Sequence, residues 1–210
     1  MIGGIDVSAW QGDIDWAAVA GSGVRFAIVR VAVRSGDEPK TDTRFKANLE
    51  AAGDNGILRG VYMYVSATDA DTGLSDALFL ISALDGAALE LPVFYDLENS
   101  ALSSVAKGNE EYEKYLAGMR IFMETVEKAG YRAGLYTASD EADVMLKTDA
   151  AGNSAGRTVW LADYSADPDG FDFGGTFRCL QYSNTGKVAG ISGAVDLDRM
   201  IIFIKATGDE

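Results

Sequence analysis

The stretch Leu91-Pro92-Val93-Phe94-Tyr95-Asp96-Leu97-Glu98 combines a buried strand with two acids at its end. Its first residues are apolar almost throughout, as in strands that are covered on both faces of a parallel sheet. Asp96 and Glu98 are two positions apart, so in a strand both side chains point to the same face. Because burying carboxylates among apolar residues costs free energy, this pair needs a functional or structural reason.

Apolar segments of the same kind, rich in Val, Ile, Phe and Tyr, recur along the 210 residues and predict eight strands. The predicted strands cover residues 4–7, 26–31, 60–65, 91–97, 133–137, 158–164, 177–182 and 195–202. Helical periodicity lies between the earlier strands, over residues 15–20, 43–55, 71–85, 110–129 and 139–148. After residue 164 the strands follow one another through Gly- and Asp-rich turns.

This order predicts an α/β fold, an irregular TIM-like barrel of five β/α units followed by three strands, with parallel-type strands throughout. The alternative is an open doubly wound sheet, which is disfavoured because no Gly-rich phosphate fingerprint follows the first strand. No linker or repeat interrupts the chain, so we expect one catalytic domain over residues 1–210.

The predicted helices have apolar faces that should pack against the sheet. In the helix over residues 71–85 we expect Leu74, Leu78 and Ile81 to form that face. The helix over residues 43–55 has Asp42 as its expected N-cap. The single cysteine, Cys179, lies in an apolar stretch and is expected to be a packed core thiol.

Composition excludes several classes of function. The net charge of −14 repels phosphate backbones, so we expect no nucleic-acid partner. The chain has no histidine, which excludes Ser-His-Asp and Cys-His catalysis and His-dependent metal sites. Acid–base chemistry must therefore come mainly from carboxylates. We expect no cofactor and no metal, because the spacing of Ca²⁺ ligands is not evident.

No apolar run is long enough to span a bilayer, and residues 1–4 lead directly into a strand without a signal-like segment. We therefore expect either a secreted or cell-wall-associated mature form that lacks its signal, or a cytoplasmic chain. We also expect a monomer.

Acids lie at about the same level on three predicted strands, with Asp6 on the first, Asp96 and Glu98 on the fourth and Asp196 on the last. In a β/α barrel the functional residues sit at the C-terminal ends of the strands, so these acids should meet in one pocket. Packing them together raises the pKa of at least one, which suits a general acid for a glycosidic oxygen. The alternative is a set of strand-end caps or a cation site.

Besides the acids, a site for sugars needs groups that bind the substrate, and aromatic residues can supply them. Sugar rings stack on their faces, and phenol hydroxyls form hydrogen bonds to ring substituents. The predicted substrate-binding set also includes two polar residues from the last strands. It consists of Tyr62, Tyr64, Tyr136, Trp160, Tyr164, Gln181 and Asp198. Any one aromatic by itself is typical of ordinary core packing.

The segment Gly4-Ile5-Asp6-Val7-Ser8-Ala9-Trp10-Gln11-Gly12 resembles the N-terminal signature of glycoside hydrolase family 25, the Chalaropsis-type lysozymes or N-acetylmuramidases. The resemblance continues along the chain, in order, through residues 26–30, 60–64, 92–98, 130–136, 160–164, 181–183 and 190–197. It implies a barrel of five β/α units plus three strands. It also implies hydrolysis of the β-1,4 bond between N-acetylmuramic acid and N-acetylglucosamine in peptidoglycan glycan strands.

The resemblance places the acid at Glu98, with Asp6, Asp96 and Asp196 completing the acidic pocket. Asp96 is then expected to steer the 2-acetamido group of the substrate as it attacks the anomeric carbon. The rival is direct water attack with Asp6 as the base. A chitinase-like barrel and a catalytically weak peptidoglycan-binding module are the alternatives for the whole chain.

Two positions depart from the family pattern. Met63 stands where the family usually has histidine, and by alternation its side chain should point away from its neighbouring tyrosines. Asp198 stands where the family commonly has asparagine. We expect its extra negative charge to raise the pKa of the catalytic acid and to shift the pH optimum upward.

Overall fold

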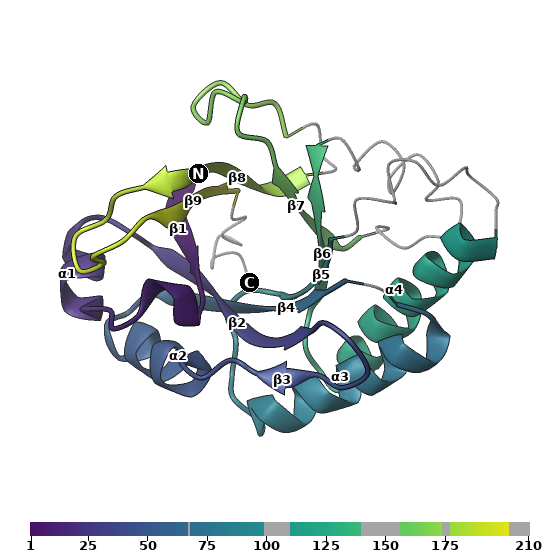
Figure 1. Cartoon of the computed structure of the whole chain (residues 1–210). Coiled ribbons are helices and arrows are strands. Elements are labelled where there is room, and N and C mark those ends of the chain that lie inside the picture. The colour runs from purple at the N-terminus through teal and green to yellow at the C-terminus, as the bar shows by residue number, and fades with distance from the viewer. Residues whose placement is uncertain (67, 99–109, 140–155, 174–176, 202–210) are drawn as a thin grey trace, which may run out of the picture.

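The computed structural model describes residues 1–66, 68–98, 110–139, 156–173 and 177–201. Eight strands close into a barrel, because β1 pairs with β2 on one side and with β9 on the other (Figure 1). Their bounds are β1 Ile2–Val7, β2 Phe26–Arg34, β4 Leu58–Val65, β5 Val93–Leu97, β6 Ala133–Ala138, β7 Thr158–Ala162, β8 Phe177–Gly186 and β9 Val195–Met200. The short β3 (Lys40–Thr41) pairs only with β2. The predicted α/β barrel is confirmed.

The helices follow the early strands and cover one side of the barrel (Figure 1). They are η1 Ala9–Gln11, α1 Trp16–Gly21, α2 Phe45–Asp54, α3 Ala70–Leu84 and α4 Glu110–Lys128. The helix predicted over residues 139–148 lies outside the described residues apart from its first position. In the part of the chain that the structure describes, no helix is both long and apolar enough to cross a membrane.

Strand β9 runs against its neighbours. Among the eight barrel strands, the pairs from β1 through β8 are parallel, whereas β9 is antiparallel to both β8 and β1. The short β3 outside the barrel is also antiparallel to β2. The expectation of parallel strands throughout is therefore wrong at β9. Residues 187–194 alone connect β8 to β9, which is shorter than a parallel crossover needs. Asp196 near the start of β9 therefore lies opposite Asp6 near the end of β1, and both reach the same mouth of the barrel.

Strand alternation divides the core into two layers. Inside the barrel, Phe26, Phe94 and Trp160 belong to one apolar cluster, which also contains the predicted core thiol Cys179. A larger cluster fills the space between the strands and the helices. Met63 belongs to this outer cluster while its neighbours on β4 face inward, as alternation predicts.

The predicted face of α3 and the predicted cap of α2 are both wrong. Leu74 and Leu78 are exposed, and α3 instead buries Gly73, Asp76, Ala77, Leu80 and Leu84. Gly73 sits so close to Gly118 of α4 that a Cβ atom would lie 2.2 Å from the Gly118 carbonyl oxygen, so this close helix approach selects the face. The N-cap of α2 is Arg44, whose side chain makes no capping hydrogen bond. Asp42, two residues earlier, accepts hydrogen bonds from Arg44 N, from Ala9 N and from the Arg30 side chain.

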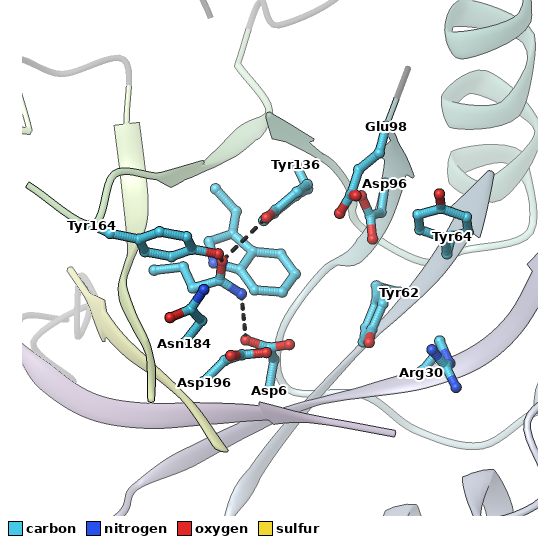
Figure 2. Close-up of a pocket in the computed structure, with 12 residues that line it drawn as sticks. Asp6, Arg30, Tyr62, Tyr64, Asp96, Glu98, Tyr136, Tyr164, Asn184 and Asp196 are labelled. Atoms are coloured by element: carbon cyan, nitrogen blue, oxygen red, sulfur yellow. Dashed lines mark hydrogen bonds between the residues drawn. The ribbon is translucent and has the colours of Figure 1, made fainter. Parts of the chain in front are cut away.

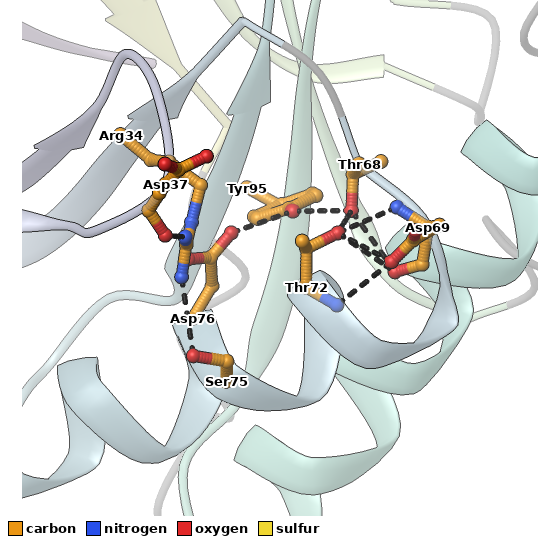
Figure 3. A network of polar contacts seen from close by, with 8 residues as sticks. All are labelled: Arg34, Asp37, Thr68, Asp69, Thr72, Ser75, Asp76 and Tyr95. Atoms are coloured by element: carbon orange, nitrogen blue, oxygen red, sulfur yellow. Dashed lines mark hydrogen bonds and ion pairs between the residues drawn. The ribbon is translucent and has the colours of Figure 1, made fainter.

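A buried polar network joins β2, α3 and β5 behind the barrel wall (Figure 3). Arg34 at the end of β2 forms an ion pair with Asp76, which has no exposed surface. Tyr95 Oη lies 3.1 Å from Asp76 Oδ2 and 2.8 Å from Thr68 Oγ1. Because Tyr95 precedes Asp96 on β5, this network fixes the outer face of the strand that carries the predicted acids.

Replacing Arg34 with Met is expected to reduce the free energy of unfolding by about 3–5 kcal/mol, because it leaves the carboxyl group of Asp76 buried without its cation. Urea denaturation measures the loss. The matched control is Arg59→Met, which breaks the more exposed pair with Glu90 and should cost no more than about 1 kcal/mol. Equal losses in the two variants would contradict a special role for the buried pair.

Candidate active site

A pocket of about 270 Å³ opens at the mouth of the barrel (Figure 2). It is lined by Asp6, Arg30, Tyr62, Tyr64, Asp96, Glu98, Tyr136, Trp160, Tyr164, Gln181, Asn184 and Asp196. The structure thus brings together every residue of the predicted site except Asp198. Figure 2 shows Asp96 and Glu98 on one side of the pocket and Asp6 and Asp196 on the other.

Strand β5 supplies one acidic side. Phe94 and Asp96 share the inner face of the strand, with Phe94 fully buried below and Asp96 almost buried above it. Glu98 directly follows the strand and remains accessible to solvent, with its amide N–H bonded to the Val65 carbonyl oxygen. Partial burial of its carboxyl group, followed by the negative charge of Asp196, raises the pKa of Glu98. A raised pKa favours the protonated form that a general acid needs.

Strands β1 and β9 supply the opposite acidic side. Asp6 is buried, and its Oδ2 accepts a hydrogen bond of 2.7 Å from Gln181 Nε2. Burial is the main cause that raises the pKa of Asp6, and the charges of Asp198 and Asp196 add to it. Burial also raises the pKa of Asp196. The prediction that crowding the acids raises the pKa of at least one is consistent with this geometry.

The aromatic residues form the floor and rim of the pocket. The floor is Trp160, which is 1% exposed and packs edge-on against Tyr62, Phe94 and Tyr136 with ring centroids 4.7–6.0 Å apart. Tyr164 is half exposed at the rim, where burial and nearby acids raise its pKa to about 12. Its hydroxyl therefore stays protonated at neutral pH and is available as a hydrogen-bond donor.

Gln181 connects the tyrosines of the pocket to the acidic side formed by β1 and β9. Its Oε1 accepts hydrogen bonds from Tyr136 Oη at 3.1 Å and from Tyr164 Oη at 2.9 Å, while its Nε2 donates to Asp6. One amide on β8 thus orients two rim tyrosines and one acid. This is more than the sequence predicted for Gln181, which was expected only to bind substrate.

Asp198 lies beneath the pocket instead of on its surface. It has no exposed surface, and its Oδ1 accepts a hydrogen bond of 2.9 Å from Trp160 Nε1. Its charge raises the pKa of Asp6, whereas the raised pKa of Glu98 has burial and Asp196 as its causes. The expected effect of Asp198 on a pocket acid is therefore found at Asp6 and not at Glu98.

Two lining residues were not predicted to be part of the site. Arg30 carries the positive charge among the described residues of the pocket wall, and Asp42 neutralises it through an ion pair of 2.8 Å. The sequence contained a signal for Arg30. Alternate residues of a strand share one face, so Arg30 lies on the same inward face of β2 as Phe26 and Ile28. Asn184 follows an irregularity of the β8–β9 pairing, where alternation no longer predicts the face.

The pocket therefore combines carboxyl groups with raised pKa values, a cation that is neutralised by an ion pair, and an aromatic floor. Such a site donates and accepts protons beside a stacked sugar ring without needing histidine. Burial of the acids matters because it raises their pKa values and so favours the protonated form that a general acid needs.

Comparisons with known proteins agree with this chemistry. The family model of glycosyl hydrolases family 25 matches residues 5–191. Lysozyme M1 from Streptomyces globisporus is 30% identical, over 93% of this chain and 66% of its own length, so the chain spans just under two thirds of that relative.

Two solved structures have the same fold. The bacterial lysozyme from Streptomyces coelicolor is 26% identical with a TM-score of 0.73, covering 95% of this chain and 91% of that one. A modular autolysin from Streptococcus pneumoniae is 25% identical with a TM-score of 0.76, covering 94% of this chain and 46% of that one. With the family model matched over most of its length, the chain belongs to glycosyl hydrolases family 25.

Proposed function

We propose that this protein is a lysozyme that hydrolyses the β-1,4 bond between N-acetylmuramic acid and N-acetylglucosamine in peptidoglycan. The observation that carries the proposal is the pocket itself, in which acids from β1, β5 and β9 face one another above an aromatic floor. Family membership and the similarity to lysozymes support the choice of substrate.

In this proposal Glu98 protonates the leaving-group oxygen and then acts as the base for water. Its accessible position and raised pKa suit both steps. Asp96 steers the 2-acetamido group of the substrate, which attacks the anomeric carbon and gives an oxazolinium-like intermediate. This role is supported by the side chain of Asp96, which points into the pocket from the same strand that leads to Glu98 (Figure 2).

The rival mechanism uses Asp6 as a base for direct attack by water. Burial and the charges of Asp198, Asp196 and Asp96 raise the pKa of Asp6, which makes it a weak candidate for a residue that must be ionised to act. A chitinase-like site is disfavoured because it would have a further aspartate at the position of Phe94, which here packs against Trp160 inside the barrel.

The test is digestion of purified bacterial cell walls, followed by identification of the new reducing ends. The expected result is loss of turbidity with N-acetylmuramic acid at every new reducing end. New ends that carry N-acetylglucosamine would indicate a glucosaminidase. Binding to the walls without any new reducing end would instead support the peptidoglycan-binding module.

A further inference from the structure

Trp10 has the most exposed large apolar side chain among the described residues, with 85% of its surface open to solvent. Tryptophan is usually well covered in folded proteins, because its large ring gains free energy from burial. The other two tryptophans follow this rule, since Trp16 is 4% exposed and Trp160 is 1% exposed. One exposed apolar residue is common by itself, so what matters is where Trp10 lies and how it is held.

Trp10 lies on η1, a short turn that hydrogen bonds hold in place. Ser8 Oγ accepts from Trp10 N at 3.2 Å, and Gln11 Oε1 accepts from Ser8 N at 2.9 Å, so the turn is capped reciprocally. Ala9 N donates to Asp42 Oδ2 at 3.0 Å, and Asp42 is the ion-pair partner of the arginine in the pocket wall. The indole ring is therefore presented to solvent by a fixed backbone that is tied to the pocket.

The same turn lies at the mouth of the barrel that contains the pocket. It follows β1 directly, and Trp10 is four residues after Asp6, so their Cα atoms are at most about 14 Å apart. Gln11 Nε2 donates at 3.4 Å to the carbonyl oxygen of Ala194, which is two residues before Asp196. Trp10 is thus placed beside the acidic side of the pocket that β1 and β9 form.

The other strongly exposed large apolar side chains help to identify what Trp10 contacts. Leu74 and Leu78 lie on α3, and Met1 precedes the opposite end of β1. Of the described residues in this class, Tyr164 shares the mouth with Trp10, because it follows the end of β7 and lines the pocket. The strand order β1-β9-β8-β7 separates these two aromatics by three strand spacings of about 4.8 Å along the barrel wall.

This arrangement favours a carbohydrate over a protein or membrane partner. A protein or membrane surface would need a continuous apolar patch, whereas these two aromatic rings are separated along the rim of an acidic pocket. Separate aromatic rings suit a chain of sugars, because each ring can stack on one sugar while the hydroxyl groups remain in water.

Building on the lysozyme function proposed above, we propose that Trp10 is a platform on which one sugar of a bound glycan strand stacks, outside the pocket on the side of β1. The pocket holds the sugars that flank the cleaved bond, and Trp10 binds a sugar farther along the same strand. This contact adds affinity for long glycan chains. It takes no part in proton transfer, because the indole N–H is a hydrogen-bond donor only.

Trp10→Ala is expected to raise KM for long glycan chains by about tenfold with little change in kcat, because it removes binding that is equal in the ground state and the transition state. The long chains are released from cell walls by removing the peptides. The short substrate is the disaccharide that contains only the cleaved bond, and its kcat/KM should be the same in variant and wild type. Trp10→Phe, which keeps an aromatic ring, should restore most of the affinity. Leu78→Ala removes an exposed apolar side chain on α3 and is the matched control, for which neither constant should change.

Fluorescence provides a readout that needs no cleavage. Because Trp16 and Trp160 are buried, acrylamide should quench mainly Trp10, and this accessible emission should be missing from Trp10→Ala. In Glu98→Gln, which is expected to bind glycan without cleaving it, long chains should protect the accessible emission from acrylamide. The disaccharide should give no protection, because it fills only the pocket.

The proposal is overturned if Trp10→Ala and wild type have the same KM for long chains, or if saturating long chains leave Trp10 as open to acrylamide as before. An equal rise in KM for the disaccharide would also contradict it, because the effect of Trp10 would then lie within the pocket. Failure of the proposed function would instead appear as absence of new reducing ends with wild type. Protection of Trp10 by long chains would in that case still decide whether this turn binds glycan.

Discussion

Glu98→Gln is expected to lower kcat for cell-wall hydrolysis by about 10³–10⁴-fold, the upper range for loss of a general acid–base. The amide keeps the size of the side chain but cannot deliver a proton to the leaving oxygen or take one from water. KM should change little, because the aromatic floor and the remaining acids of the pocket are untouched. Initial rates of turbidity loss over a range of wall concentrations separate the two constants.

Glu90→Gln is the matched control, because Glu90 forms an ion pair with Arg59 before the start of β5 and does not line the pocket. It should retain full activity. Both variants should unfold at midpoints close to that of wild type, since Glu98 remains accessible to solvent and Glu90 is exposed. If Glu98→Gln clears walls as fast as wild type, the assignment of the proton donor to Glu98 is wrong.

The pH dependence of activity is a second test of Glu98 as the catalytic acid. The acid must be protonated, so activity should fall as pH rises through the pKa of Glu98. Burial and the charge of Asp196 raise this pKa, which keeps the group protonated at a higher pH than an ordinary glutamate. The profile of Glu98→Gln should lack this descending limb, because the variant has no proton to lose at that position.

Much of the barrel and most of the pocket were predictable, because both depend on the alternation of inward and outward side chains along each strand. Once residues 91–98 are read as a strand, alternation puts Asp96 inside with Phe94 and puts Tyr95 outside, where it meets the network of Arg34 and Asp76. The same rule brings Tyr62 and Tyr64 to the pocket and turns Met63 away. In a barrel, strand ends at one mouth converge without any knowledge of distant contacts.

The errors occur where long-range geometry overrides local patterns. The apolar periodicity of Leu74 and Leu78 is real, but the close approach of Gly73 to Gly118 turns another face of α3 inward. The direction of β9 depends on the length of its connection, which the strand pattern does not encode. Asp198 was predicted to bind substrate in the pocket, but it is fully buried. The alternation of side chains along a strand predicts which residues point inward, but not how deep in the barrel they lie.

The inner layer of the barrel explains why depth matters for chemistry. Asp196 and Asp198 share one face of β9, yet only Asp196 lines the pocket, while Asp198 lies one layer below, beside Trp160. The upper acid faces the open pocket, whereas the lower one has no exposed surface. Two aspartates on the same face of one strand therefore lie in different environments, because only one of them is open to the pocket.

Asp96→Asn is expected to lower kcat by about 10²–10³-fold with little change in KM, because Asp96 interacts most strongly with charge that develops after binding. When the acetamido oxygen attacks the anomeric carbon, positive charge forms on the acetamido group, and a carboxylate stabilises it better than an amide does. The variant should fold normally, since Asn has nearly the same shape in this almost buried position. Initial rates on wall fragments measure the loss.

The stereochemistry of the product distinguishes this role from the rival. Attack by the acetamido group followed by water retains the anomeric configuration, whereas direct attack by water inverts it. We expect NMR of the first-formed product to show retention. We also expect Asp6→Asn to lose less activity than Asp96→Asn, because burial and the neighbouring acids raise the pKa of Asp6, which disfavours the ionised form that a base needs. Inversion, together with a larger loss in Asp6→Asn, would transfer the second catalytic role from Asp96 to Asp6.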